Sequence, residues 1–565
     1  QMRTVLLLSL VLASPVGAAA LSDTGGPLSA DQAAYDVLAY DLDLAIDPEA
    51  QRLDGTVTME ARTVRALRRL ELDLDDRLQV TSVSLGLDES SLRPAAFRHG
   101  DGKLWVEVPE PVAADRRLRV AVQYGGQPRV APNPPWDGGF TWKRTASGQP
   151  WFGVSCQADG ADLWWPAKDH PSDEPERGVA LHLRVPADLT VISNGRLVGT
   201  DDHADGTRTW HWRTTGAINL YDVTVNAAPF VELTVPYTSV AGTALPITRW
   251  ALEDTPEERL LLAQLADFAA FLEGELGPYP FRADKLNLVA TPYLAMEHQT
   301  AVAYAPADAG HRDRQHGYHW IALHELTHEW WGNLVTASDW RDLWLHEGFD
   351  GFMEVLYAER RFGEEAARRV LERFRPALLN QQPVAPRSEC SMRQVFRTLD
   401  PALHAAASQN PRAMDVDAYA KGAWVLHSLR GLMGDERFFP MLRRWAYPSA
   451  EMEKITDGRQ CRLVSTEDLL RHASEAAGRD LAWFFEVYLR QPELPRLRSS
   501  RQGDELTLWW ETAGDLPFPM PVEIVGAGGE LVRLGMEEGR VTLPWPAGLA
   551  APVVDPRGRI LRAAD

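Results

Sequence analysis

The stretch His324-Glu325-Leu326-Thr327-His328, with Glu347 further along the chain, decides how this sequence is interpreted. Two histidines spaced four residues apart lie one above the other on an α-helix, with Cβ atoms about 5–6 Å apart. Both imidazoles can therefore reach one metal ion at about 2.0–2.1 Å. Glu325 lies beside that ion rather than on it, where it can hold a water molecule and take its proton.

Glu347 offers a third ligand to the same ion. It opens a second helical pattern that stops at Gly363, while Gly332-Asn333 predicts the end of the first helix. The apolar members of the second pattern are Phe349, Met353, Leu356 and Tyr357. Two neutral imidazoles and one carboxylate leave one position open, as at a catalytic zinc site. We therefore expect one zinc ion per chain, held by His324, His328 and Glu347. The alternative is a helix with two ordinary histidines, which the pentapeptide alone does not exclude.

The residues around this motif carry a resemblance to a known family. The runs His328-Glu329-Trp330-Trp331-Gly332-Asn333 and Trp344-Leu345-His346-Glu347-Gly348-Phe349 are similar to those of the gluzincin aminopeptidases, the group that holds aminopeptidase N and leukotriene hydrolase. The resemblance implies zinc-dependent hydrolysis of the amino-terminal peptide bond in peptides with a free amino terminus. The family usually has glutamine where Glu329 stands and asparagine where His346 stands, and neither is an expected metal ligand.

A second resemblance concerns the substrate's amino group. The run Leu294-Ala295-Met296-Glu297-His298 is similar to the family's Gly-Ala-Met-Glu-Asn stretch, whose glutamate binds the substrate's amino terminus. It follows the apolar run Leu286 to Ala290, so Glu297 could lie on a strand that edges the zinc cleft. The substrate contacts implied here are Ala295, Met296 and Glu297. Leu294 and His298 depart from the family's residues. A glutamate on a solvated strand edge is the alternative interpretation of Glu297.

Two further runs contribute expected site residues. In Cys156-Gln157-Ala158-Asp159, the resemblance makes Gln157 a hydrogen-bond partner of the substrate's amino end, and Asp159 stands where some members have an acid. In Tyr419-Ala420-Lys421-Gly422-Ala423, which is similar to the family's Tyr-x-Lys-Gly-Ala segment, Tyr419 is the expected donor to the substrate oxyanion. Such a donor is worth about 2.7–4 kcal/mol. A surface loop is the alternative for Gln157 and Asp159, and packing is the alternative for Tyr419. Cys156 is expected to be a buried small hydrophobe.

Composition places the chain among soluble multidomain proteins. It has 565 residues, of which 45% are hydrophobic and 24% charged, and a formal net charge of −21. This charge argues against a nucleic-acid partner, which requires a basic face. Residues 2–20 combine an apolar run with Ala18-Ala19-Ala20 and predict an export signal, hence a periplasmic or secreted protein. We expect no later transmembrane helix. Cys390 with Cys461 is the one disulfide pairing considered for this exported chain.

Alternating apolar residues dominate the first part of the chain. Runs such as Tyr40 to Ile46 and Val179 to Val185 alternate between apolar and polar residues and are separated by turn-forming residues. They predict an N-terminal antiparallel β domain over residues 35–245. We expect the small, polar residues from Leu21 to about Ala34 to form a loose arm.

Helical patterns follow, and the fold class is therefore multidomain α+β. Thr255-Pro256-Glu257-Glu258 is a capping box that opens the first helix of a mainly helical region, residues 246–492. Alternation returns near Leu506 and predicts a small C-terminal β-sandwich over residues 493–565. This order resembles the first three domains of the family, whose catalytic domain is thermolysin-like. We expect no counterpart of the family's large helical fourth domain within these residues.

The sequence favours an exported zinc aminopeptidase with Glu325 as general base and Tyr419 as oxyanion donor. Two other functions stay open. A peptide-binding protein with decayed peptidase chemistry would have lost a metal ligand or Glu325, and neither is lost. Hydrolysis of a lipid epoxide, a side activity of one family branch, would need a deep apolar channel. The preferred amino-terminal residue and the oligomeric state do not follow from the sequence.

Overall fold

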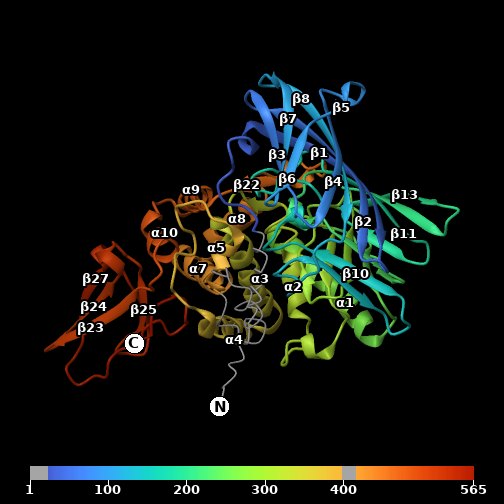
Figure 1. Cartoon of the computed structure of the whole chain (residues 1–565). Helices are drawn as coiled ribbons and strands as arrows, with labels where there is room; N and C mark the ends of the chain where they lie inside the picture. Colours follow the sequence, from blue (N-terminus) through green and yellow to red (C-terminus); the bar gives the residue numbers. More distant parts are fainter. Residues whose placement is uncertain (1–22, 397–414, 565) are drawn as a thin grey trace, which may run out of the picture.

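The computed structural model describes residues 23–396 and 415–564, which form three parts in chain order (Figure 1). A β part, coloured blue to green, is followed by a helical part and then by a small β part, coloured red, at the side of the helices. The predicted export signal, residues 2–20, lies outside the described residues. The predicted α+β class is confirmed. None of the helices in the described ranges combines the length and the apolar character that a membrane span needs.

The largest sheet of the N-terminal part has eight strands in the order β13-β14-β11-β1-β2-β8-β4-β5. The alternation predicted for β1 (Tyr35–Asp47) is confirmed, because Leu42 is buried between the outward-facing Asp41 and Asp43. The prediction of an antiparallel sheet is wrong in one place, since β1 and β11 (Val179–Pro186) run parallel. Parallel strands need a long crossover connection, and the nine strands β2 to β10 lie between these two in the chain.

Two smaller sheets complete this part, in the orders β3-β7-β6 and β12-β15-β10-β9. The remaining strands of the three sheets are β2 (Arg52–Thr63), β3 (Leu67–Asp73), β4 (Leu78–Gly86), β5 (Arg93–Pro94), β6 (Phe97–Gly100), β7 (Lys103–Val112), β8 (Arg117–Gly126), β9 (Gly139–Arg144), β10 (Pro150–Ser155), β12 (Thr190–Ser193), β13 (Arg196–Asp202), β14 (Thr207–Arg213) and β15 (Val225–Ala228).

The sheet of the middle part begins earlier than predicted. Its order is β16-β17-β18-β20-β19, so β16 (Val231–Val235) already belongs to it. The predicted boundary at residue 245 therefore falls inside this sheet, 14 residues after β16 begins. An alternating strand has the same pattern in either sheet, and only its pairing with β17 (Ile247–Ala251) assigns it. The other strands are β18 (Leu286–Ala290), β19 (Ala295–Met296) and β20 (Ala301–Tyr304).

Helices make up most of the rest of the middle part. The predicted cap of α1 (Pro256–Leu276) is confirmed, since the Thr255 hydroxyl accepts from the Glu258 amide. The helix α2 (Trp320–Thr327) ends earlier than the predicted stop at Gly332, because the backbone hydrogen bonds after Thr327 span three, four or five residues instead of a regular four. The other helices are α3 (Trp344–Phe362), α4 (Glu364–Phe374), α5 (Met392–Phe396), α7 (Asp417–Met433), α8 (Asp435–Ala446), α9 (Thr466–Ala477) and α10 (Ala482–Leu489), and the strands β21 (Val335–Ala337) and β22 (Arg462–Val464) pair among them.

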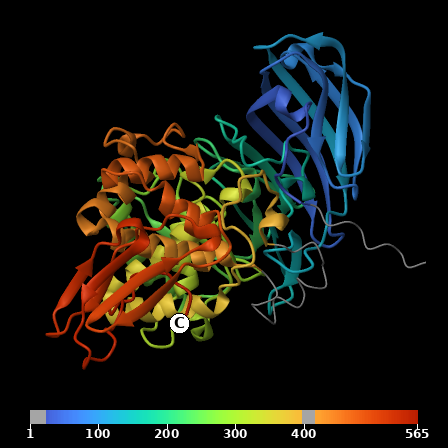
Figure 2. The same ribbon diagram turned by 90° about the vertical axis from the view of Figure 1, so that its left-hand side faces the viewer.

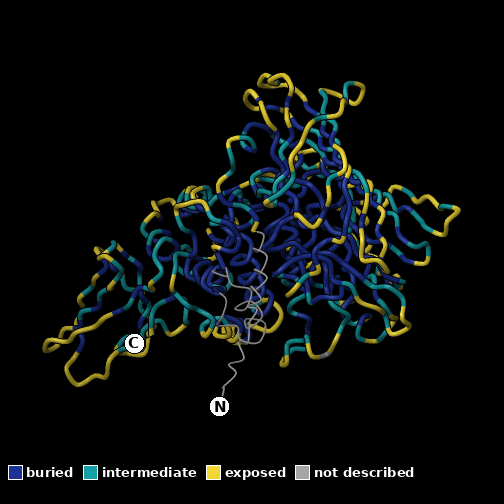
Figure 3. Tube along the Cα trace, viewed as in Figure 1, coloured by how far each residue is buried: buried dark blue, intermediate teal, exposed yellow. Residues whose placement is uncertain are grey.

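The C-terminal part consists of two small sheets, β23-β24-β27 and β25-β26. Its strands are β23 (Arg496–Gln502), β24 (Glu505–Glu511), β25 (Val522–Val525), β26 (Leu531–Leu534) and β27 (Arg540–Pro544). Turned by 90°, the molecule shows these red sheets in front of the helices, with the blue N-terminal strands at the opposite side of the view (Figure 2). Buried residues concentrate where the N-terminal part meets the helices, and the outer hairpins are exposed (Figure 3).

The first described residues form an ordered strap rather than a loose arm. Thr24 donates its backbone N–H to Ala158 at 3.3 Å and accepts from the Met392 amide at 3.0 Å. Its hydroxyl lies 3.4 Å from the indole nitrogen of Trp340. Gly25 packs so closely that a Cβ atom there would lie 2.4 Å from a Trp340 ring carbon. Residues 23–26, which we call the strap, therefore join the β part to two places in the helical part.

The cysteines do not support the pairing considered from the sequence. Cys156, Cys390 and Cys461 all lie in the described ranges, and all three are free. The Cys390–Cys461 disulfide is therefore wrong. Cys156 is fully buried, as predicted, and burial raises the pKa of its thiol well above the usual value.

Candidate active site

The end of α2, with the residue that follows it, and the start of α3 bring the atoms of the three predicted metal ligands together. The two Nε2 atoms of His324 and His328 lie 3.3 Å apart. The Glu347 Oε2 atom lies 3.3 Å from the first and 3.4 Å from the second. An ion about 2.0–2.1 Å from three ligands in tetrahedral geometry holds those ligands about 3.3–3.4 Å apart. The three predicted ligands therefore fit a tetrahedral zinc site with its fourth position open.

Carboxylates behind the imidazoles orient them. Glu354 Oε1 lies 3.0 Å from His324 Nδ1, and Asp350 Oδ2 lies 2.5 Å from His328 Nδ1. Accepting the Nδ1–H of each ring leaves both Nε2 lone pairs for a metal. The sequence analysis missed Glu354 and Asp350. A signal was present, because Glu347, Asp350 and Glu354 are spaced i, i+3, i+7 and so share one face of α3.

Glu325 and Glu297 lie close to the metal ligands. Together with His328 they offer ligand atoms that all lie within 4.8 Å of one another. Glu325 is largely buried, and this burial raises the pKa of its carboxyl to about 8. A carboxyl with a pKa near neutrality can exchange a proton under ordinary conditions, as a general base and acid must.

Glu297 directly follows β19, the terminal strand of its sheet, rather than lying on a strand. Its carboxylate accepts a hydrogen bond from the Tyr221 hydroxyl at 3.0 Å, and its carbonyl accepts from the Asn333 side chain at 3.0 Å. It is 3% exposed, and burial raises the pKa of its carboxyl. A buried carboxylate of this kind gains from a cationic partner. No sequence pattern pointed to Tyr221 as a neighbour of Glu297, because it lies 76 residues earlier, in the N-terminal β part.

Ala295 and Met296 form the short strand β19 itself. They pair with Tyr304 and Ala303 of β20, and both are buried. Since β19 ends the sheet, its second edge has no strand partner in the described sheet order. A strand edge of this kind can receive an extended peptide through main-chain hydrogen bonds.

Gln157 and Asp159 lie in one loop of the β part, but their side chains contact different parts of the molecule. The Gln157 amide nitrogen lies 3.4 Å from Glu347 Oε1, so this residue extends into the metal cluster. Asp159 is fully buried and pairs with Arg129 at 2.7 Å and with Arg393. The carboxylate of Asp159 thus joins the loop to α5, and we leave it out of the substrate-binding set proposed below.

Tyr419 approaches the metal cluster from α7. Its ring stacks on that of His324 with centroids 6.2 Å apart and planes 15° from parallel. Burial and a hydrogen bond to Glu347 raise the pKa of its hydroxyl well above the usual value, so the hydroxyl keeps its proton. The approach of α7 to α3 depends on two glycines, since a Cβ atom on Gly348 would lie 2.8 Å from the Gly422 Cα. Lys421, which the sequence left open, donates to the carbonyls of Gln491 and Pro492.

The two departures from the family's motif are structural. The Glu329 carboxylate accepts from the Tyr279 hydroxyl at 2.5 Å and from the Thr300 amide at 2.9 Å. The His346 ring accepts from the Ala337 amide at 2.8 Å, and burial lowers the pKa of this ring to about 3. Both side chains are held by hydrogen bonds from neighbours in the fold, although the other ring nitrogen of His346, Nδ1, is buried without a partner among the described residues.

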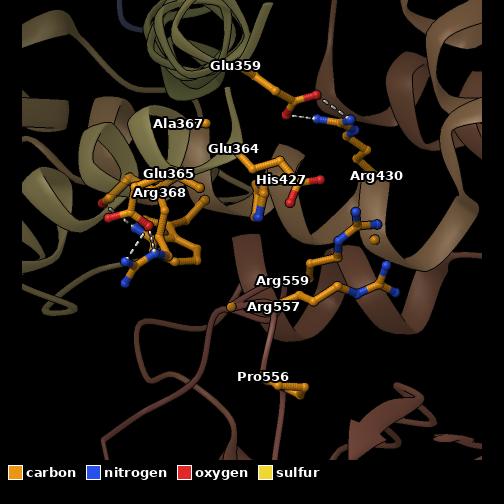
Figure 4. Close-up of a pocket in the computed structure, with 14 residues that line it drawn as sticks. Glu359, Glu364, Glu365, Ala367, Arg368, His427, Arg430, Pro556, Arg557 and Arg559 are labelled. Atoms are coloured by element: carbon orange, nitrogen blue, oxygen red, sulfur yellow. Dashed lines mark hydrogen bonds and ion pairs between the residues drawn. The ribbon is translucent and has the colours of Figure 1, made fainter. Parts of the chain in front are cut away.

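A separate cavity of about 410 Å³ lies between α4, α7 and the chain around residues 556–559 (Figure 4). Its walls carry several charges that neutralise one another, including the pairs Glu359–Arg430 at 2.6 Å and Glu365–Arg368 at 2.6 Å. None of the metal-cluster residues lines it. This cavity therefore does not share the chemistry of the metal cluster.

The chain matches two described protein domains. Residues 37–221 match the Peptidase M1 N-terminal domain, and residues 276–488 match the Peptidase family M1 domain. Together the two matches cover more than half of the chain. The second contains all three metal ligands, Glu325, Glu297 and Tyr419, while the first contains Gln157.

Individual relatives with similar sequences are named as aminopeptidases. The chain is 32% identical over 192 residues to aminopeptidase N of Lactococcus lactis, covering 33% of this chain and 20% of that protein. It is 26% identical over 313 residues to endoplasmic reticulum aminopeptidase 2 of Bos taurus, covering 50% of this chain and 30% of that protein. The chain thus spans well under two thirds of the length of these relatives.

Solved structures share the fold. A mutant M1 zinc metallopeptidase from Deinococcus radiodurans, crystallised with a Tyr-Ser-Ala substrate, superposes with a TM-score of 0.62 at 23% identity. The match covers 82% of this chain and 95% of that one. At this level of identity, the likeness concerns the arrangement of the elements.

Proposed function

The chain belongs to the M1 peptidase family, and from this we propose that it is a zinc-dependent aminopeptidase that removes the amino-terminal residue of peptides. One observation carries the proposal. A set of three ligand atoms with tetrahedral zinc spacing, His324, His328 and Glu347, has the buried carboxylate of Glu297 close beside it. A metal to activate the bond and an anion to hold the substrate ammonium are what an amino-terminal exopeptidase requires.

Each residue has a role in this proposal. When bound, one zinc ion per chain would act as a Lewis acid on the scissile carbonyl and would acidify water. Glu325 takes the proton of the attacking water and later gives it to the leaving amine. The Tyr419 hydroxyl donates a hydrogen bond to the substrate oxygen as negative charge develops there. Glu297 and Gln157 hold the substrate ammonium, and the edge of Ala295–Met296 aligns the substrate backbone.

A panel of aminoacyl chromogenic amides tests the activity. We expect hydrolysis by the purified protein, loss of hydrolysis with a chelator, and recovery when zinc is added. Glu325→Gln should keep the zinc but lose almost all turnover, because it removes the base without removing a ligand. A protein that binds these compounds without hydrolysing them would instead support the peptide-binding alternative. No described feature favours the epoxide hydrolase alternative.

The domain limits and the destination of the chain also remain proposals. We propose an N-terminal β domain from residue 35 to about 229, a thermolysin-like catalytic domain to residue 492, and a C-terminal β-sandwich domain over residues 493–565. The composition of residues 2–20 supports export to the periplasm or the medium. Sequencing the amino terminus of the protein recovered from its host compartment would test that proposal.

A further inference from the structure

Two histidines face each other on the outer surface of the eight-stranded sheet, far from the metal cluster in sequence. His182 on β11 lies directly opposite His211 on β14. Their Nδ1 atoms are 2.6 Å apart, and the ring planes are inclined by 63°. Their side chains are 31% and 25% exposed, while the neighbouring Leu181 and Trp212 point into the core.

The outer nitrogens of both rings have carboxylate neighbours. His211 Nε2 lies 2.9 Å from Asp201 Oδ2 on β13, and His182 Nε2 lies 3.5 Å from Asp41 Oδ1 on β1. A carboxylate accepts a hydrogen bond, so it favours the tautomer that has its proton on Nε2. In that tautomer, the two Nδ1 lone pairs face each other across 2.6 Å. Such a contact is repulsive unless a cation lies between the two nitrogens.

We propose that this pair is a binding site for a transition-metal dication of the Zn²⁺, Cu²⁺ or Ni²⁺ class, with Nδ1 of His182 and His211 as its protein ligands and water in the other positions. Imidazole nitrogen suits these metals, whereas Mg²⁺ and Ca²⁺ prefer oxygen. Histidines that bind metals commonly donate the other ring N–H to a carboxylate, which Asp41 and Asp201 provide here.

The geometry needs only a small adjustment to admit a metal. Two nitrogens at about 2.0–2.1 Å from one ion lie about 2.9 Å apart in square-planar geometry and about 3.3–3.4 Å apart in tetrahedral geometry. The rings would therefore have to separate by less than about 1 Å, and their partial exposure leaves room for this rotation. A bound ion would link β11 to β14 on the face of the sheet away from the core.

The competing occupant of the gap is a proton. A shared proton makes one ring the donor and the other the acceptor. If both Nε2 atoms also carry protons, one ring is an imidazolium, and the Asp41 carboxylate would stabilise it, in keeping with the raised pKa of His182, whose first cause is its hydrogen bond to Asp41. A shared proton and a shared metal make opposite predictions for metal titrations, because a proton-bridged pair has no lone pair to offer at neutral pH.

The test is a Cu²⁺ titration of the full-length, zinc-loaded protein, followed by calorimetry and electron paramagnetic resonance. We expect one copper per chain in addition to the zinc, with a spectrum that shows two nitrogen ligands. His182→Gln and His211→Gln should each abolish this copper while leaving the zinc content and peptidase activity unchanged. His203→Gln is the matched control, because His203 lies beside the same strands but hydrogen-bonds Thr209.

A second substitution separates a built site from chance surface binding. Asp201→Asn keeps both ligands but removes the charge that orients His211, and it should weaken copper binding by about 10- to 100-fold. Equal copper binding by the wild type and by His182→Gln would overturn the proposal. The proposal would also be overturned if the wild-type protein bound no copper other than at the zinc site. The two histidines would then share a proton instead of a metal ion.

Discussion

Replacing Glu297 by glutamine tests the claim that this protein recognises a free amino terminus. The amide has nearly the same shape as the carboxylate, and its oxygen can still accept from the Tyr221 hydroxyl, which lies 3.0 Å from the carboxylate in the structure. The change therefore removes a negative charge and little else. No metal ligand is altered, so the zinc content should stay the same.

The burial of Glu297 sets the size of the effect. At 3% exposure, its carboxylate is shielded from water, and a substrate ammonium that binds it loses its own hydration. Removing one partner of such a pair costs about 2–5 kcal/mol. This corresponds to a loss of roughly thirty- to several-thousandfold in kcat/KM for a substrate with a free amine.

The assay compares one aminoacyl amide with its amino-acetylated analogue in both proteins. The acetylated compound has no charge to pair, so the wild type should cleave it poorly and the substitution should change its cleavage little. The four rate constants form a double-mutant cycle whose coupling energy measures the ammonium–carboxylate pair. Equal losses on the two substrates would refute the reasoning and would indicate a zinc endopeptidase instead.

Three other substitutions test the site and its support. Tyr419→Phe should lower kcat by about two to three powers of ten with little change in KM, and unchanged turnover would return the tyrosine to a packing role. Asp350→Asn should weaken zinc binding by about 10- to 100-fold in a competition with a chelating dye. An unchanged zinc affinity would show that the His328 ring does not depend on Asp350 for its orientation. Gly25→Ala should destabilise the protein by about 1–3 kcal/mol more than Gly26→Ala in denaturant titrations, because the two share a positive φ but only the first overlaps Trp340. Equal losses of stability in the two variants would mean that the strap shifts to make room for the added methyl group.

Residues close in sequence were predictable, and residues that meet only in the fold were not. The spacing of His324 and His328 implies their convergence on any helix, so the closeness of their two Nε2 atoms followed from local geometry. Asp350 and Glu354 were within reach of the same argument, since they share a helical face with Glu347. Tyr221 was not, because a hydroxyl from one domain meets a carboxylate from another only after both have folded.

The same distinction between local and distant contacts separates the parts of the fold that the sequence predicted from those it did not. Capping residues and alternation predicted α1 and β1 well, because both signals lie within one element. The parallel pairing of β1 with β11 and the assignment of β16 to the second sheet depend on distant partners, so a periodic pattern could not specify them. Asp159 is a similar case, since its partner Arg129 lies in a loop of the β part and its partner Arg393 lies in α5.

The strap has a consequence for the order in which the molecule is assembled. Thr24 bonds to a residue 316 positions later, and Asp23 accepts from the amide of Arg393, 370 positions later. A ribosome that makes the chain from its amino end must therefore synthesise nearly 400 residues before this contact can form. Trp340 packs against Tyr221, which in turn holds Glu297. The zinc ligands can gather from neighbouring helices once Glu347 and the rest of α3 have emerged. The strap can close only after α5 has been made, so the three ligand atoms can come together before residues 23–26 are tied to the helices.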